Sequence, residues 1–184
     1  YIGRKPKELA AALLIRLGGE LCGGMLILLK QSLAYPAAAL LRQLVEVEYL
    51  AFIGYADPLN LQNWYEATDE ERRKLFTPQK MRKLSDGLFR DSEYWLHCEV
   101  GGHPHPKSKI MLPAYGPKVP PVAALLPDAV HHIRRLWTSV SLLLPQLDAG
   151  ELVLEELGTS LPAAILNWES IEHPMILAFD GIGE

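Results

Sequence analysis

Hydrophobic residues recur along most of this chain at intervals of three and four positions, the period of a helix that buries one face. The alternation of apolar and polar residues that marks a half-buried strand is scarce. Proline and glycine signals then bound four long predicted helices, at about 6–33, 36–55, 77–102 and 121–147. The predicted fold is therefore all-α, a bundle of four or five main helices.

Local signals refine these boundaries. Thr68 with Glu71 has the capping-box spacing that opens a short charged helix, and Thr77 caps the helix that follows. Gly87 is a point at which that helix could be interrupted. The helix must end at Gly101-Gly102, because the prolines of the sequence GGHPHP prevent helical continuation. Within the last long helix, Pro127 predicts a second start at Asp128.

The first predicted helix is unusually apolar and carries two glycine pairs, Gly18-Gly19 and Gly23-Gly24. The glycines predict either a kink or the close approach of a neighbouring helix. The stretch Leu9–Leu29 is long enough to span a bilayer, but Arg16 and Glu20 near its middle would each cost about 2.5–3.5 kcal/mol there. We therefore interpret it as a core helix and expect no membrane partner.

Length and composition narrow the class of protein. The 184 residues, 49% hydrophobic and 22% charged, predict one folded domain and exclude a disordered chain. Two cysteines exclude a disulfide-dense scaffold, and reduced thiols in the cytoplasm are the expectation.

Charge is unevenly distributed along the chain. The net charge is −4, yet residues 145–184 contain eight acidic residues and no lysine or arginine. The sequence predicts a helical core over 6–147, with acidic C-terminal helices over 148–184. A basic, proline-rich loop at 103–118 carries Lys107, Lys109 and Lys118 and no acid. The asymmetry fits either a basic surface for an anionic partner such as RNA or two ordinary solvated faces.

One candidate site lies in the sequence RDSEYWLH. On a continuous helix, Arg90 and His97 would share a face about 10.5 Å apart along the axis. Histidine transfers protons near neutral pH, and arginine stabilises charge that develops on a phosphate. The pattern resembles the arginine, polar residue, spacer, histidine motif of the all-helical HEPN (higher eukaryotes and prokaryotes nucleotide-binding) proteins. That resemblance implies a homodimeric, metal-independent endoribonuclease of a toxin–antitoxin or antiphage defence system.

A broader resemblance covers about residues 36–106. The order of a helix containing LLRQLVEVEYL, a tryptophan-containing connector, a helix starting at Thr-Pro and the segment YWLHCEVGGHP is similar to a group of bacterial helical proteins placed near HEPN domains. The positions that this resemblance assigns are Arg42, Glu46, Tyr94, Glu99 and His103. It therefore selects His103 where the shorter motif selects His97, and both assignments stay open.

Physically, Arg42 and Glu46 are four residues apart and can pair on one helical face, within reach of His103 at the start of the loop. Glu46 would then orient the imidazole and raise its pKa. The same network could instead serve only to fix packing geometry.

Metal and cofactor signals are weak. His97, Cys98, Glu99, His103 and His105 offer suitable ligand atoms, but their spacing matches no zinc signature. No dinucleotide, phosphate-loop, serine-hydrolase or zinc-protease motif is present, so we expect no metal and no nucleotide cofactor. A metal-dependent hydrolase is the third hypothesis. His131 and His132 project to different faces of a helix and are assigned no role.

Together these patterns predict a HEPN-like, RNA-directed protein, a candidate metal-independent endoribonuclease. His97 or His103 would transfer the proton, Arg90 or Arg42 would stabilise phosphate charge, and the loop lysines would guide RNA. The alternative is a non-enzymatic helical interaction or regulatory domain of a larger protein, with a homodimer or another protein as partner.

Overall fold

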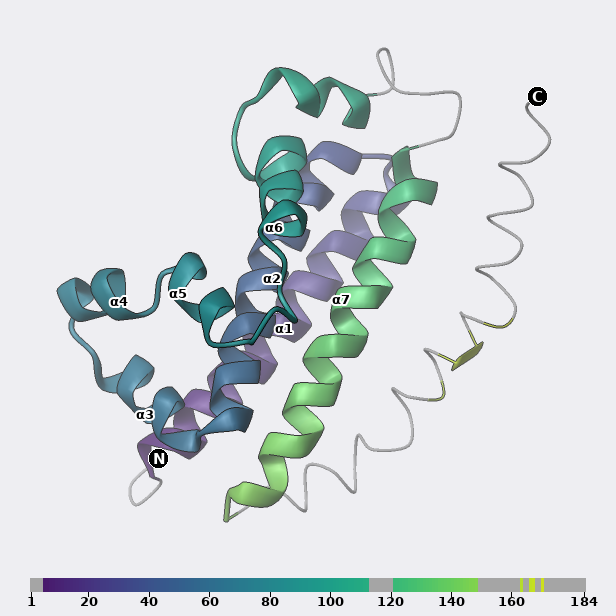
Figure 1. Cartoon of the computed structure of the whole chain (residues 1–184). Helices are drawn as coiled ribbons and strands as arrows, with labels where there is room; N and C mark the ends of the chain where they lie inside the picture. The colour runs from purple at the N-terminus through teal and green to yellow at the C-terminus, as the bar shows by residue number, and fades with distance from the viewer. Residues whose placement is uncertain (1–4, 113–120, 149–162, 164–165, 168–169, 171–184) are drawn as a thin grey trace.

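The computed structural model describes residues 5–112 and 121–148, together with positions 163, 166, 167 and 170 (Figure 1). Over the described residues the regular elements are helices and no strand occurs, which confirms the all-α expectation. Three helices are long, and the rest are short: α1 (Pro6–Lys30), α2 (Ala34–Ala56), α3 (Pro58–Glu66), α4 (Asp69–Leu75), α5 (Pro78–Lys83), α6 (Asp91–His97), the π-helical turn η1 (Cys98–Gly102), the 3₁₀ turn η2 (Pro106–Met111), α7 (Pro121–Leu143) and the 3₁₀ turn η3 (Leu144–Gln146). The acidic helices expected over 148–184 fall almost entirely outside the described residues.

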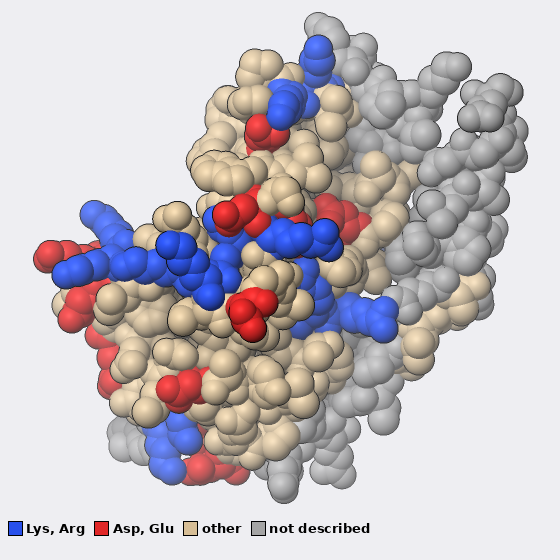
Figure 2. Space-filling model, viewed as in Figure 1, with Lys and Arg blue, Asp and Glu red and all other residues tan. Residues whose placement is uncertain are grey.

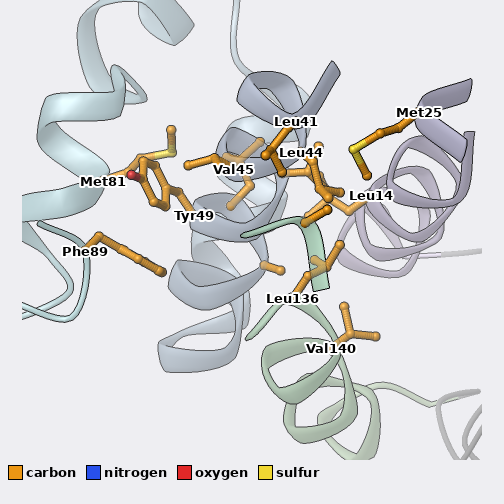
Figure 3. Packing of buried hydrophobic residues seen from close by; sticks show 14 of the residues in the cluster. Leu14, Met25, Leu41, Leu44, Val45, Tyr49, Met81, Phe89, Leu136 and Val140 are labelled. Atoms are coloured by element: carbon orange, nitrogen blue, oxygen red, sulfur yellow. The ribbon is translucent and has the colours of Figure 1, made fainter. Parts of the chain in front are cut away.

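The core forms around α2, which packs against α1, α7 and most of the short helices. Figure 3 shows Leu41 and Leu44 of α2 pointing toward Leu14 of α1, with residues of α7 beside them. On another side of α2, the Tyr49 ring lies 4.3 Å from the Phe89 ring, measured between centroids. Full burial of a large apolar side chain contributes about 1.5–3 kcal/mol, so each of these core residues stabilises the fold measurably.

The glycine pairs of α1 mark close helix approach rather than a kink. A Cβ added at Gly18 would lie 3.0 Å from a methyl carbon of Leu136 in α7, and one at Gly24 would lie 3.1 Å from Leu40 in α2. Gly19 and Gly23 face open space. The helix thus packs through one face only, and 22% of its most apolar stretch is buried, which is less than the expected core helix would bury. Its length and hydropathy would also suffice for a membrane span.

The second helix start expected at Asp128 is wrong, because α7 continues unbroken through Pro127. Proline removes one backbone hydrogen bond but keeps a helical φ, and burial of Leu125 and Ala129 on either side holds the turn together. Because no helix starts at Asp128, its carboxylate does not cap a helix and pairs with the His97 ring instead.

The helix expected over 77–102 is interrupted where Gly87 allowed a break, because the chain turns between α5 and α6. Asp86 and Gly87 have positive φ values of 49° and 86°, which no helix interior accommodates. The Ser85 hydroxyl accepts a hydrogen bond from the Phe89 amide at 3.1 Å, which fixes the turn. Burial of Phe89 against Tyr49 therefore takes precedence over helical continuation.

Candidate functional site

The short helix α6 carries polar side chains on two adjacent faces, each built from residues four positions apart. Tyr94 and Cys98 contact Arg42 of α2. Glu93 and His97 contact the polar side chains of α7. Because residues four apart on a helix lie one above the other, each face presents a matched pair of groups. Two polar clusters result, one on each face.

The first, the Arg42 cluster, consists of Arg42, Glu46, Tyr94 and Cys98. The Arg42 guanidinium pairs with the Glu46 carboxylate at 2.6 Å, donates through Nε to Cys98 Sγ at 3.2 Å, and donates to the Tyr94 hydroxyl. This confirms the predicted pairing of Arg42 with Glu46 and brings Tyr94 to it. Burial alone would lower the pKa of Arg42, but the Cys98 contact and the Glu46 charge raise it, so the arginine stays a cation.

Close packing of η1 on α2 brings Cys98 to the Arg42 cluster. A Cβ added at Gly101 would lie 2.4 Å from the backbone carbonyl carbon of Ala38, a distance that no side chain tolerates. The glycine pair that ends this helical segment is thus also a contact surface between elements.

The other residues selected by the broader resemblance do not join the Arg42 cluster. Glu99 pairs with Lys107 at 2.6 Å. The His103 side chain is exposed and contacts neither Arg42 nor Glu46, and its backbone amide donates to the Cys98 carbonyl. The expectation that His103 reaches the Arg42–Glu46 pair is therefore not met. Lys109 is exposed, and Lys118 lies outside the described residues.

Arg90 and His97 also differ from the expected geometry. α6 begins at Asp91, and Arg90 precedes it with extended backbone angles, so the two residues do not share a helical face. Arg90 is exposed, whereas His97 is only 2% exposed and its Nε2 lies 2.9 Å from Asp128 Oδ2. The buried Phe89 turn explains the difference, because it ends the preceding helix just before this motif.

The second cluster, the histidine network, joins α2, α6 and α7 and consists of Glu48, His97, Asp128, His132 and Arg135. His132 Nδ1 lies 2.6 Å from Glu48 Oε2, and Arg135 Nε lies 2.7 Å from Glu48 Oε1. His132 Nε2 lies 3.5 Å from Asp128 Oδ1. Glu48 and His132 are 0% and 1% exposed, so their charges and hydrogen-bonding groups depend on each other rather than on water.

Within the histidine network, each ionisable group changes the pKa of its neighbours. Burial by itself lowers the pKa of His132, but the carboxylates of Asp128 and Glu48 beside its ring outweigh burial and raise it to about 9. Burial by itself raises the pKa of Asp128, but its contacts with His132 and His97 bring it far below its usual range. His97, Asp128 and His132 place one ligand atom each within 4.8 Å of one another, a group that could hold a metal ion.

A cleft of about 650 Å³ opens beside the histidine network, between α6 and α7. Arg135 lies at its base, pairing with Glu93 at 3.0 Å and donating to His131 Nε2 at 3.1 Å. Burial and the charge of Arg135 lower the pKa of His131, so this imidazole is neutral at physiological pH. Arg90 lines the same cleft and makes no ion pair with any residue that the structure describes. The full lining is Leu88, Arg90, Ser92, Glu93, Leu96, His131 and Arg135.

The sequence patterns did not select Glu48, Asp128 or Arg135 as site residues, and His132 was assigned no role. A signal was present: Glu93 with His97 and Asp128 with His132 both place an acid four residues before a histidine. Two such pairs on facing helices form a compact set of nitrogen and oxygen atoms.

Comparison with protein-family models, with curated proteins and with solved structures finds no match to this chain.

Proposed function

We propose that this chain is a HEPN-like, RNA-directed protein and that its working site is the cleft between α6 and α7. The observation that carries the proposal is the gathering of Arg90, Arg135, His131 and Ser92 around one solvent-open cleft. Guanidinium groups bind phosphate oxygens in a planar, bidentate manner, and a neutral imidazole accepts a proton. These are the groups that cleavage of an RNA phosphodiester needs.

Surface charge supports an extended RNA path. Figure 2 shows Lys and Arg side chains in a band across one face, from the α4–α5 region past the start of α6 to the middle of α7, with acidic side chains among them. Exposed basic residues of these segments are Arg73, Lys74, Lys80, Lys83, Arg90 and Arg134. A single strand that followed this band would cross the cleft, since Arg90 belongs to both.

The proposed reaction is attack of a ribose 2′-hydroxyl on the adjacent phosphate. His131 would accept the hydroxyl proton, once the phosphate replaces it as the partner of Arg135, and Arg90 would stabilise the charge on the phosphorane oxygens. The 5′-oxygen of the next nucleotide would leave with a proton from solvent, giving a 2′,3′-cyclic phosphate. His97, selected by the HEPN motif, pairs with Asp128 behind the cleft wall and takes no part in these steps. No metal is needed for these steps.

The test is cleavage of single-stranded RNA in EDTA by the purified chain. Arg90→Ala and His131→Ala should each reduce the rate by about 10²-fold or more. The first removes a contact to the transition state, and the second removes the base. Arg16→Ala, which removes an exposed cation from α1, is the matched control and should cleave normally. Cleavage that survives both cleft substitutions, or absence of cleavage by the wild type, would overturn the proposal.

A second candidate, a non-enzymatic interaction domain, is favoured by the outer face of α1. Leu13, Leu17, Leu26 and Ile27 are between 38% and 65% exposed there. An apolar face of this kind suits a protein partner or a second copy. Salt dependence separates the two functions, because RNA affinity falls steeply with salt and apolar association does not.

A further inference from the structure

We propose that His97, Asp128 and His132 bind one divalent transition-metal ion where α6 meets α7. This site is separate from the RNA proposal, because its ligands lie behind the cleft wall and the proposed cleavage uses no metal. The bound ion would connect α6 and α7, the two helices that form the cleft.

The spacing of the ligand atoms is close to that of a metal-bound set. Nitrogen and oxygen ligands at about 2.0–2.2 Å from a tetrahedral ion lie roughly 3.4 Å from one another. In this chain Asp128 Oδ2 is 2.9 Å from His97 Nε2, and Asp128 Oδ1 is 3.5 Å from His132 Nε2. Small side-chain rotations would therefore bring all three groups onto one ion.

His132 is already oriented as a ligand. Glu48 contacts its Nδ1 at 2.6 Å, which directs Nε2 into the space between α6 and α7. That buried Nε2 has no hydrogen-bond partner among the described residues. A metal-binding histidine usually bonds through its other ring nitrogen to a carboxylate, because that contact fixes the tautomer and raises ligand basicity. Glu48 is thus a positioning residue, itself held by Arg135.

The balance of charge also calls for a cation. Glu48, Glu93 and Asp128 bring three carboxylates to this region, against the single guanidinium of Arg135. An ion that takes the place of the His132 proton leaves both imidazoles neutral, so two negative charges remain and a divalent ion neutralises them. Buried charge without compensation is strongly unfavourable, so an ion here would stabilise the contact between α6 and α7.

The ligand types indicate the class of metal. Two imidazoles and one carboxylate suit Zn²⁺, Fe²⁺, Co²⁺ or Mn²⁺ rather than Ca²⁺ or Mg²⁺, which prefer oxygen ligands. Cys98 follows His97 directly but contacts Arg42 on the other face of the segment, so its sulfur is not a ligand. A fourth position is open to water or to Glu93, whose Oε1 lies 3.5 Å from His132 Nε2.

The experiment is a titration of tag-free, EDTA-treated full chain with Co²⁺, followed by its visible absorption and by competition with Zn²⁺. We expect one ion per chain. Asp128→Asn, at a side chain that is 37% exposed, should weaken binding by about 100-fold or more. Glu48→Gln should weaken it by about 10- to 100-fold without removing a ligand. His103→Ala, at an exposed histidine that contacts neither cluster, should leave metal affinity unchanged.

Absence of a saturable Co²⁺ signal from the folded wild type would overturn the metal site. Equal affinity in Asp128→Asn and wild type would also overturn it. Circular dichroism checks folding of each variant, and His97→Gln replaces Asp128→Asn should the latter fail to fold. Because RNA cleavage is measured in EDTA, failure of one proposal is distinguishable from failure of the other.

Discussion

The Arg42 cluster and the histidine network are neighbours on α6, yet they differ in burial and in how they are assembled. The Arg42 cluster is half-buried, and the Glu46 side chain within it is 40% exposed. The histidine network rests on Glu48, which is 0% exposed, only two residues further along α2. Water can replace a lost partner in the first cluster but not in the second. Glu48, the less conspicuous of the two acids on α2, should therefore matter more than Glu46 for stability and for the histidine network.

The sharpest test of this contrast replaces each acid in turn. Glu48→Ala should lower the free energy of unfolding by about 3–5 kcal/mol, because His132 and Arg135 lose the carboxylate that pairs them inside the protein. Glu46→Ala should cost no more than about 1 kcal/mol, since its pair with Arg42 is partly solvated. Urea unfolding of both variants measures the difference. Equal losses would mean that burial does not separate the two clusters.

A second test concerns the backbone contact that supports the Arg42 cluster. Gly101→Ala should destabilise the protein by about 1–3 kcal/mol, because the new Cβ would strike the Ala38 backbone. Gly19→Ala is the matched control, since its Cβ would meet nothing within 4 Å, and it should stabilise α1 by about 0.5–1 kcal/mol. Thermal unfolding of the two variants should therefore shift in opposite directions. A shift in the same direction would contradict the close packing of η1 on α2.

A third test asks how much the Arg42 cluster contributes through its hydrogen bonds. Tyr94→Phe removes the hydroxyl that accepts from Arg42 but keeps the ring. The loss should be about 1–2 kcal/mol, the range for a hydrogen bond to a charged group. Metal affinity should not change, because Tyr94 contacts no residue of the histidine network. Altered Co²⁺ binding in this variant would show that the two clusters act as one.

The smallest effect is expected at His103. Its side chain is exposed and contacts neither cluster, so His103→Ala should change unfolding free energy by less than about 0.5 kcal/mol and leave RNA cleavage intact. Loss of cleavage in this variant would restore His103 as the proton-transfer residue.

Much of the fold could be predicted, because its signals are local. Thr68 caps α4 with Glu71 in a capping box, and Thr77 caps α5, both as their spacing indicated. The pairing of Arg42 with Glu46 followed from four-residue spacing on one helix. Pro127 was misleading because local proline rules carry no information about the tertiary burial that keeps α7 continuous.

The histidine network could not be predicted in the same way. Glu48 and His132 are 84 residues apart, and only the packing of α7 on α2 brings them together. His97 was selected because a continuous helix would place it on the same face as Arg90. The turn at Phe89 instead leaves Arg90 before the start of α6. The two pairs of an acid and a histidine four residues apart can be found in the sequence. That they meet depends on the packing of α6 against α7, which the sequence patterns do not give.

We propose that RNA binds at the α6–α7 cleft rather than at the Arg42 cluster. The most direct measurement is a titration of isotope-labelled protein with single-stranded RNA, followed by backbone amide NMR. We expect shift changes to concentrate at residues 88–96 and 131–135, which line the cleft, with little change at 98–103. Changes centred on 98–103 and on Arg42, with the cleft silent, would contradict it.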